Sequence, residues 1–139
     1  NDAHISCVDT WAGSDEHENI KFNDVEKNFD KNIFNHIDQN KISKIKLSSD
    51  DFFKINEIFF DIIYIDGDHE VNQVSRDIYN SWKKLNKGGY LILDDYTWWW
   101  YKDLYKNPAH AINNFIIDKI DEIELTELVI WKQVFIKKK

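Results

Sequence analysis

The sequence predicts an α/β fold built around a mainly parallel sheet. Short apolar runs alternate with helical patterns along the chain, which indicates repeated βαβ units. Residues 59–66 (FFDIIYID) are dominated by apolar and β-branched side chains, as is typical of a strand that is covered on both faces. Since 139 residues are enough for one compact domain and too few for two, we expect residues 1–139 to form a single domain.

The first part of the chain is predicted to run strand, helix, strand. Residues 4–9 (HISCVD) and 41–47 (KISKIKL) are the two strand candidates. Between them, from Asn23 onwards, apolar residues recur every four positions and predict one face of a helix. These residues are Val25, Phe29, Ile33 and Ile37.

A second helix follows the apolar run at 59–66. Apolar residues recur there at spacings of three and four, which predicts an amphipathic helix. These residues are Val71, Val74, Ile78, Trp82 and Leu85. We expect Gly88 and Gly89 to end this unit, and residues 90–94 (YLILD) to begin the next strand.

The last part of the chain is predicted to hold one more helix and two strands. Asn107 and Pro108 are suited to the N-cap and the first turn of a helix. Residues 122–136 alternate well enough between apolar and polar to predict two final strands.

Composition limits the classes of function. A hydrophobic content of 42% supports a packed core, and a net charge of −7 argues against a general nucleic-acid binder. The single Cys7 cannot form an internal disulfide, and a structural thiol in a reducing compartment is its simplest interpretation. No apolar run approaches the roughly 20 residues that span a membrane, and no signal peptide is visible. We therefore expect a cytoplasmic protein.

Acidic residues gather at the ends of two predicted strands. Asp66, Asp68 and His69 follow the run at 59–66, and Asp94 and Asp95 end the next strand. A right-handed crossover makes these two strands neighbours or near neighbours, and ligands of open α/β sheets bind beyond the carboxyl ends of the strands. We therefore expect the carboxylates to converge.

Converging carboxylates favour a hard divalent cation such as Mg²⁺, which binds oxygen ligands. His69 beside that cation would be a neutral imidazole that can accept a proton as a general base. The alternative stays open that these acids cap helices in solvent and that His69 is a loop histidine bonded to the backbone.

The segment 64–98 (YIDGDHEVNQVSRDIYNSWKKLNKGGYLILDDYTW) closely resembles class I S-adenosylmethionine-dependent methyltransferases, and among them the group related to macrocin-type sugar O-methyltransferases. The segments CVDTWAGSDEH, NPAHAINNF and WKQVFIKK also fit, so the likeness covers nearly the whole chain. The pairing of Asp-Gly-Asp-His with Gly-Gly…Asp-Asp-Tyr at this spacing is fairly specific. The resemblance implies a Rossmann-like sheet, mainly parallel, with an antiparallel C-terminal hairpin.

The resemblance also implies roles for single residues. Asp66, Asp94 and Asp95 match the metal ligands of the family, and His69, together with Asp66, matches its catalytic positions. Asp9 matches the acid that binds the ribose hydroxyls of S-adenosylmethionine. By the same likeness, Ser49 and Asp50 lie where the family contacts the adenine end. The implied reaction is metal-assisted O-methylation of a small-molecule acceptor, such as a sugar or glycosylated metabolite, with no nucleic-acid or membrane partner.

The chain departs from the family at its front. The family opens with a strand, a helix and a Gly-rich turn that holds the cofactor, and none of the four glycines here forms such a turn. In the family that strand lies between the strands ending at Asp9 and Asp66, so its loss leaves sheet edges that invite a homo-oligomer. The chain is then a fragment or a rearranged short form, its flanking strands pair directly, or a partner strand fills the gap. We favour the first and expect weak or no cofactor binding.

Five aromatic residues follow the acidic pair: Trp98, Trp99, Trp100, Tyr101 and Tyr105. Three consecutive tryptophans cannot all face a core, so we expect at least one to line a surface or an acceptor pocket.

Two other functions stay open. One is a hydroxylase-like or hydrolytic relative that uses the same metal, and the other is a domain that binds metal or a partner without catalysis.

Overall fold

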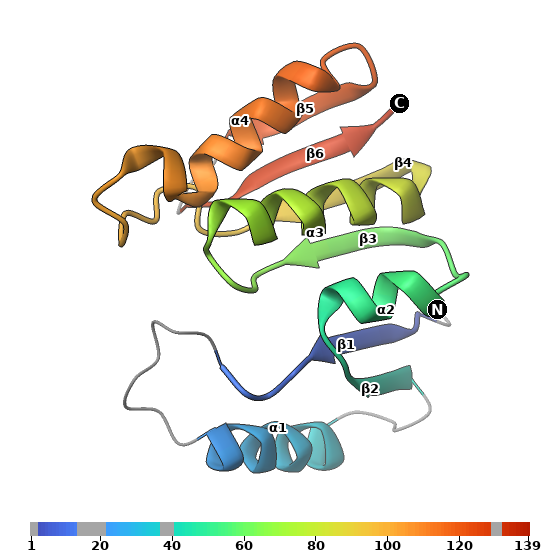
Figure 1. Ribbon diagram of the computed structural model, residues 1–139. Coiled ribbons are helices and arrows are strands. Elements are labelled where there is room, and N and C mark those ends of the chain that lie inside the picture. Colours follow the sequence, from blue (N-terminus) through green and yellow to red (C-terminus); the bar gives the residue numbers. More distant parts are fainter. Residues whose placement is uncertain (1–2, 14–21, 37–40, 129–131) are drawn as a thin grey trace. The chain divides into compact units, whose positions relative to one another are not determined.

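The computed structural model describes residues 3–13, 22–36, 41–128 and 132–139 (Figure 1). The chain divides into two compact units, Asn1–Phe52 and Phe53–Lys139, and each is described by itself. That residues 1–139 form one domain stays a prediction. Within the described residues, no helix is both long and apolar enough to cross a membrane.

The first unit is a βαβ element. Strands β1 (Ile5–Asp9) and β2 (Ile42–Lys46) pair in parallel, and helix α1 (Phe22–His36) connects them. Lys44 on β2 joins Glu26 and Asp30 of α1 at 2.9 and 2.6 Å, which ties the helix to the sheet. The predicted order of strand, helix and strand is confirmed, although Ile37 lies outside the described residues.

Cys7 on β1 is a free, half-buried thiol. Burial raises the pKa of this thiol above its ordinary value, so that the reactive thiolate is disfavoured. The structure thus supports the interpretation of Cys7 as a structural residue.

The second unit is a four-stranded sheet with two helices. Its elements are β3 (Phe60–Ile65), α3 (Val71–Lys84), β4 (Leu85–Leu93), η2 (Leu104–Lys106), α4 (Pro108–Asp118), β5 (Ile123–Leu128) and β6 (Val134–Lys138). The strand order is β3-β4-β6-β5, with β3 parallel to β4 and with β6 antiparallel to both of its neighbours. This confirms the predicted parallel crossover and the antiparallel C-terminal hairpin.

Helices α3 and α4 lie side by side and cover one face of this sheet (Figure 1). The core between these two helices and the sheet is apolar and nearly inaccessible to water. Its members include Val74, Ile78 and Trp82 of α3, Ala111, Ile112 and Phe115 of α4, and Leu91, Leu93, Val134 and Ile136 of the strands.

The other face of β3 is exposed in this unit. Ile63 and Ile65 pack against the core, whereas Ile62 and Tyr64, which alternate with them, are 62% and 49% exposed. The expectation that this strand is covered on both faces is therefore not met within the unit. The apolar side chains on the second face of β3 are not covered by the described residues of this unit.

The two glycines lie inside a strand and do not separate helix from strand as predicted. Helix α3 ends at Lys84, and β4 begins at once with Leu85 and includes Gly88 and Gly89. A Cβ on Gly89 would lie 2.8 Å from the backbone oxygen of Asp61, next to the register shift between β3 and β4. Close approach of two backbones, and not helix termination, explains this glycine.

Each unit has its own sheet, with strand order β1-β2 in the first and β3-β4-β6-β5 in the second. Which of the three arrangements considered from the sequence the chain adopts stays a prediction. β3 is an edge strand of its own sheet.

Candidate active site

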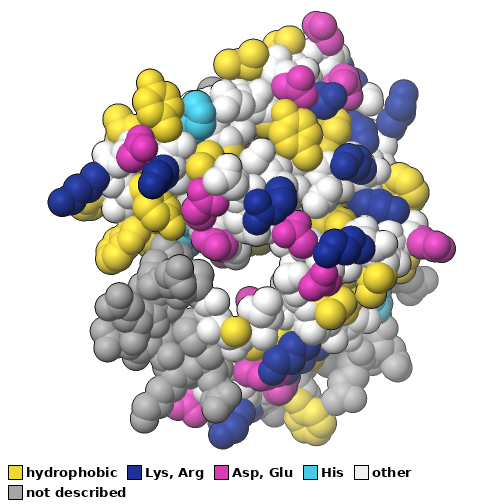
Figure 2. Space-filling view, in the orientation of Figure 1, with side chains coloured by type: hydrophobic (Ala, Val, Ile, Leu, Met, Phe, Trp, Pro, Cys, Tyr) yellow, Lys and Arg dark blue, Asp and Glu magenta, His cyan; other side chains and the backbone are white. Residues whose placement is uncertain are grey.

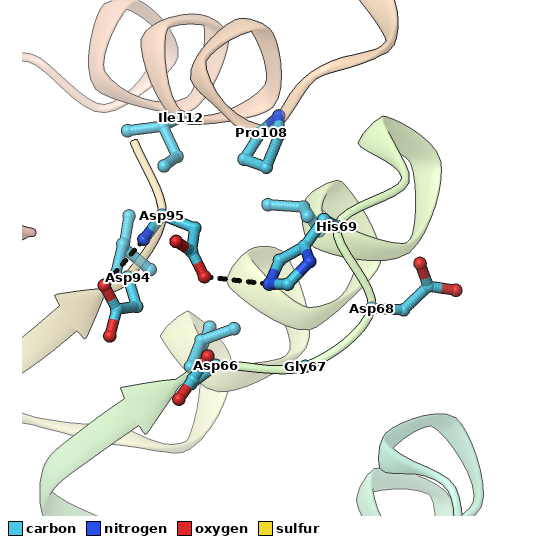
Figure 3. Close-up of a pocket in the computed structure, with 11 residues that line it drawn as sticks. Asp66, Gly67, Asp68, His69, Asp94, Asp95, Pro108 and Ile112 are labelled. Atoms are coloured by element: carbon cyan, nitrogen blue, oxygen red, sulfur yellow. Dashed lines mark hydrogen bonds and ion pairs between the residues drawn. The ribbon is translucent and has the colours of Figure 1, made fainter. Parts of the chain in front are cut away.

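The ends of β3 and β4 bring the acidic residues together. The ladder between these strands runs through the pair Ile65 and Leu93, and the backbone N–H of Asp94 donates to the Ile65 carbonyl at 3.0 Å. Asp66 therefore lies beside Asp94, although 28 positions separate them in sequence. Figure 3 shows Asp66, Asp94 and Asp95 at this edge, facing the loop that carries His69. The predicted convergence is confirmed.

His69 and Asp95 are in direct contact within the site. Nε2 of His69 lies 2.8 Å from Oδ2 of Asp95, and the two side chains are 13% and 17% exposed (Figure 3). The loop before α3 positions the histidine, because Glu70 caps that helix and accepts from the backbone N–H of Asn72 at 2.9 Å. Asp95 thus holds the imidazole by one nitrogen.

Asp66 completes a three-residue cluster. One ligand atom from each of Asp66, His69 and Asp95 lies within 4.8 Å of the other two. Partial burial, and then the charges of Asp94 and Asp95, raise the pKa of the Asp66 carboxyl above its ordinary value. The site therefore concentrates negative charge, and a cation there would relieve it.

Asp94 has a different environment from Asp66. Its Oδ2 accepts hydrogen bonds from the Tyr64 hydroxyl and, at 3.1 Å, from Gln133, and its Oδ1 accepts from the Asp95 backbone at 2.8 Å. Although partial burial opposes it, these hydrogen bonds hold the pKa of Asp94 below its ordinary value. Asp94 lies outside the cluster of Asp66, His69 and Asp95, so its expected role as a metal ligand stays a prediction.

Sequence reasoning missed Tyr64 and Gln133. Tyr64 lies at an outward-facing position of an apolar strand. Its sequence context does not indicate a contact with Asp94, which depends on the pairing of β3 with β4. Burial, and then the hydrogen bond to Asp94, raise the pKa of Tyr64, so the phenol remains a donor. Gln133 precedes β6, and only the antiparallel pairing of β4 with β6 brings it to Asp94.

The neighbouring residue Asp68 serves the loop and not the cluster. Its Oδ1 accepts from the backbone N–H of Glu70 at 3.0 Å, and Figure 3 shows its side chain pointing away from His69. The opposite wall of the pocket is apolar, because Pro108 and Ile112 of α4 face His69 and Asp95 (Figure 3). The pocket thus has one charged wall and one apolar wall.

The three residues expected to bind the cofactor belong to the first part of the chain. Asp9 ends β1, and its Oδ1 accepts from the Trp11 backbone N–H at 2.6 Å. Ser49 and Asp50 form the first turn of helix α2 (Ser49–Ile55). This short helix, which the sequence analysis did not predict, begins after Ser48, whose hydroxyl accepts from the Asp51 N–H at 3.1 Å. Their cofactor roles stay predictions.

The aromatic segment after Asp95 divides into packed and exposed residues. Trp98 is half-buried and lies on His69, with ring centroids 4.5 Å apart, whereas Trp99 and Trp100 are 82% and 64% exposed. The expectation that the three indoles cannot all face a core is confirmed. Figure 2 shows hydrophobic side chains on the surface over this loop, at the left of the view.

Buried Asn107 holds the end of this loop. Its side chain accepts from the Tyr101 N–H at 3.1 Å and donates to the Tyr101 carbonyl at 2.9 Å. The residue occupies the predicted N-cap of α4, before Pro108, but its side chain bonds the loop and does not cap the helix. The exposed rings are therefore carried by a fixed segment.

A family model described as "Methyltransferase domain" matches residues 1–96. The chain belongs to this methyltransferase family. An uncharacterised protein of Acanthamoeba polyphaga mimivirus is 34% identical over 116 residues, which is 80% of this chain and 48% of that protein. The chain therefore spans about half the length of this curated relative.

Solved structures share the methyltransferase fold. The O-methyltransferase NovP matches all of this chain and 61% of its own, with a TM-score of 0.71 and 17% identity. A Podospora anserina methyltransferase, solved with S-adenosylhomocysteine (SAH), matches 99% of this chain and 62% of its own, with a TM-score of 0.63 and 15% identity. MycE, of the mycinamycin biosynthetic pathway, matches 98% of this chain and 44% of its own, with a TM-score of 0.58 and 17% identity. The resemblance to class I O-methyltransferases is thereby confirmed at the level of fold.

Proposed function

We propose that the chain carries the acceptor-activating site of an S-adenosylmethionine-dependent O-methyltransferase that acts on a small-molecule hydroxyl with the help of a divalent cation. The observation that carries this proposal is the convergence of Asp66, His69 and Asp95 at the ends of two parallel strands. The fold of NovP supports it, and so do the ligands of MycE, which was solved with Mg, SAH and mycinamycin VI. A sugar or glycosylated metabolite is the acceptor class that we favour.

The residues present fit a hard cation. Asp66 and Asp95 offer carboxylate oxygens, and partial burial, followed by the charges of Asp94 and Asp95, raises the pKa of Asp66. The proposed ligands are Asp66, Asp94 and Asp95, although both oxygens of Asp94 already accept hydrogen bonds. When bound, Mg²⁺ would make an acceptor hydroxyl more acidic, and S-adenosylmethionine would supply the methyl group.

His69 is the proposed general base. If Nε2–H faces Asp95, the lone pair lies on Nδ1, where it can accept the proton of the acceptor hydroxyl. Asp95 fixes the tautomer and holds the ring at one nitrogen, as a carboxylate partner of a catalytic histidine does. The apolar wall of Pro108 and Ile112 limits water at the reacting oxygen. Asp9, Ser49 and Asp50 are the residues proposed to hold the cofactor.

Metal titration tests the cation directly. We expect Mn²⁺ to bind the chain in calorimetry, and we expect Asp66→Asn and Asp95→Asn to weaken this binding at least tenfold. Asp68→Asn is the matched control, because Asp68 serves the loop and points away from the cluster. Equal Mn²⁺ affinity in all four proteins would contradict the cation site.

Methyl transfer tests the reaction. The readout is transfer from S-adenosylmethionine to a panel of hydroxylated acceptors, with and without a chelator. At S-adenosylmethionine concentrations that load the chain, we expect transfer to sugar-bearing acceptors that the chelator abolishes. Transfer that the chelator leaves untouched would contradict the role of the cation and leave the methyltransferase assignment standing.

A second candidate function is assembly with another chain and without catalysis. The exposed edge strand β3, with Ile62 62% exposed on its uncovered face, favours it. A homo-oligomer through this edge would be disrupted by Ile62→Lys, which light scattering after gel filtration would detect. A monomer at micromolar concentration would contradict this candidate.

A further inference from the structure

Trp98 lies against the proposed base. Its ring centroid is 4.5 Å from that of His69, with the two planes 36° apart, which is within the range of favourable aromatic packing. The next two residues, Trp99 and Trp100, point their rings to solvent. Of the three tryptophans, Trp98 is therefore the one whose ring contacts the site.

A turn at the end of β4 places the Trp98 ring against His69. Asp95 has a left-handed backbone with φ of 55°, and the Trp98 N–H donates to the Asp95 carbonyl at 2.9 Å. The Tyr96 N–H donates to the carbonyl of Lys132 at 2.8 Å, which anchors the turn to the segment before β6. The backbone thus reverses within four residues and returns the Trp98 ring to the histidine beside Asp95.

The imidazole needs more than one restraint to stay in position. The χ2 torsion of histidine has broad minima, and a contact at the single atom Nε2 restrains rotation about it only weakly. A large flat ring packed on the imidazole restricts that rotation. The indole Nε1, which is buried, has no hydrogen-bond partner among the described residues, so its N–H does not anchor the tryptophan there.

We propose that Trp98 is a positioning residue whose ring, and not its N–H group, holds the His69 imidazole in line with Asp95. This inference rests on the proposed function, in which His69 is the base. It assigns the first of the three tryptophans to orientation of the base and leaves Trp99 and Trp100 without that role.

Nuclear magnetic resonance of the histidine ring tests the contact in the unloaded chain. His69→Gln identifies the His69 ring signals among those of the five histidines. In the wild type we expect the ring protons of His69 to be shifted upfield by the indole, and we expect Trp98→Ala to abolish this shift. Trp98→Phe, which keeps a ring and removes the N–H, should retain most of it.

Two controls keep the test decisive. Trp99→Ala removes a neighbouring exposed indole and should leave the His69 signals in place. Trp98→Leu keeps apolar volume without a ring, and unchanged methyl signals of Leu93 and Ile112 will show that a variant is folded. The proposal is overturned if Trp98→Ala and Trp98→Leu leave the His69 signals unmoved, or if Trp98→Phe moves them as far as Trp98→Ala does.

Kinetics separate this inference from the proposed function. Where methyl transfer is measurable, Trp98→Ala should lower kcat about 10- to 100-fold with KM nearly unchanged, and Trp98→Phe should restore most of kcat. If the ring signals behave as expected but chain loaded with S-adenosylmethionine methylates no acceptor, the contact stands and the proposed function fails. If kcat falls equally in Trp98→Phe and Trp98→Ala, the role of the ring is contradicted.

Discussion

Asp66 and Asp94 show how two carboxyl groups at neighbouring strand ends acquire opposite properties. Asp94 accepts hydrogen bonds from Tyr64, Gln133 and the backbone, and its pKa is lowered. Asp66 has partial burial and the charges of two other aspartates, and its pKa is raised. The first is stable as an anion without a cation, whereas the second gains most from one. Asp66 is therefore the residue at which loss of a metal should be felt first.

Asp66 should make stability depend on pH when no metal is present. Since its pKa is raised, the folded state keeps the Asp66 proton at pH values where the unfolded chain has lost it. The contribution of Asp66 to the free energy of unfolding therefore falls as pH rises above about 4. Urea denaturation with chelator should show Asp66→Asn gaining stability over wild type between pH 4 and pH 7.

The control for this prediction is Asp121→Asn, at an exposed position in the turn after α4. Its difference from wild type should stay nearly constant over the same range. A difference for Asp66→Asn that is equally flat would show that the site does not strain this carboxyl.

His69 should carry much of the rate of the proposed reaction. We expect His69→Gln, which keeps a polar side chain and removes the base, to lower kcat about 10²- to 10⁴-fold with little change in KM. His110→Gln is the matched control, since His110 lies on α4, where it contacts Tyr105 and Asn114. Equal rates for the two variants would assign the base to another group.

At the scale of elements, apolar periodicity predicted most of the fold. The spacing from Val71 to Trp82 predicted α3, and the pairing of strand ends predicted the convergence of Asp66 with Asp94 and Asp95. Features that depend on backbone approach or on partners distant in sequence were not predictable. The glycines within β4 and the Gln133 contact with Asp94 are of this kind, because each arises only once the strands are paired.

The two glycines of β4 should resist substitution for different reasons. Gly89→Ala places a Cβ 2.8 and 2.9 Å from backbone oxygens of Asp61 and Asn86, so we expect the free energy of unfolding to fall by about 1–3 kcal/mol. Gly88 has open space but φ of 80°, so Gly88→Ala should cost about 1 kcal/mol from backbone strain alone.

Urea denaturation of both variants, with Gly88→Asn as a third, separates the two causes. Asparagine tolerates left-handed backbone, so Gly88→Asn should be milder than Gly88→Ala. The explanation from backbone approach would be wrong if Gly89→Ala were as stable as the wild type.

Asn107 should stabilise the aromatic loop more than the helix that follows it. Because the side chain is 3% exposed and satisfies both backbone groups of Tyr101, Asn107→Ala should lower the free energy of unfolding by about 1–3 kcal/mol. Asn114→Ala, at an exposed position on α4, should change it by less than about 0.5 kcal/mol. Equal effects of the two variants in urea denaturation would contradict the buried role of Asn107.

At the scale of the whole molecule, the chain consists of a βαβ unit and of a unit with a four-stranded sheet. The acceptor-activating residues lie in one unit, and the residues proposed for the cofactor lie at the end of β1 and the start of α2. No turn with several glycines occurs in the 139 residues. Under the proposed function, binding of the metal and binding of the cofactor therefore depend on different residues, and each can be measured by itself.

We expect this chain by itself to bind S-adenosylmethionine weakly or not at all, while Mn²⁺ still binds at Asp66, Asp94 and Asp95. Calorimetric titration of both ligands into the same preparation measures the difference. Asp9→Asn should leave Mn²⁺ binding unchanged, since Asp9 is proposed for the cofactor alone. Micromolar affinity for S-adenosylmethionine would overturn the expectation.

The left-handed backbone of Asp95 restricts the set of amino acids that can occupy the position. At φ of 55°, glycine, asparagine and aspartate are accommodated most easily, and of these aspartate alone carries a charge. Glutamate would keep the carboxylate but incur the backbone penalty, and alanine would lose both the charge and the favourable conformation. Full mutagenesis of this codon, selected for stability alone, should therefore enrich glycine and asparagine. Selection for activity should return aspartate only.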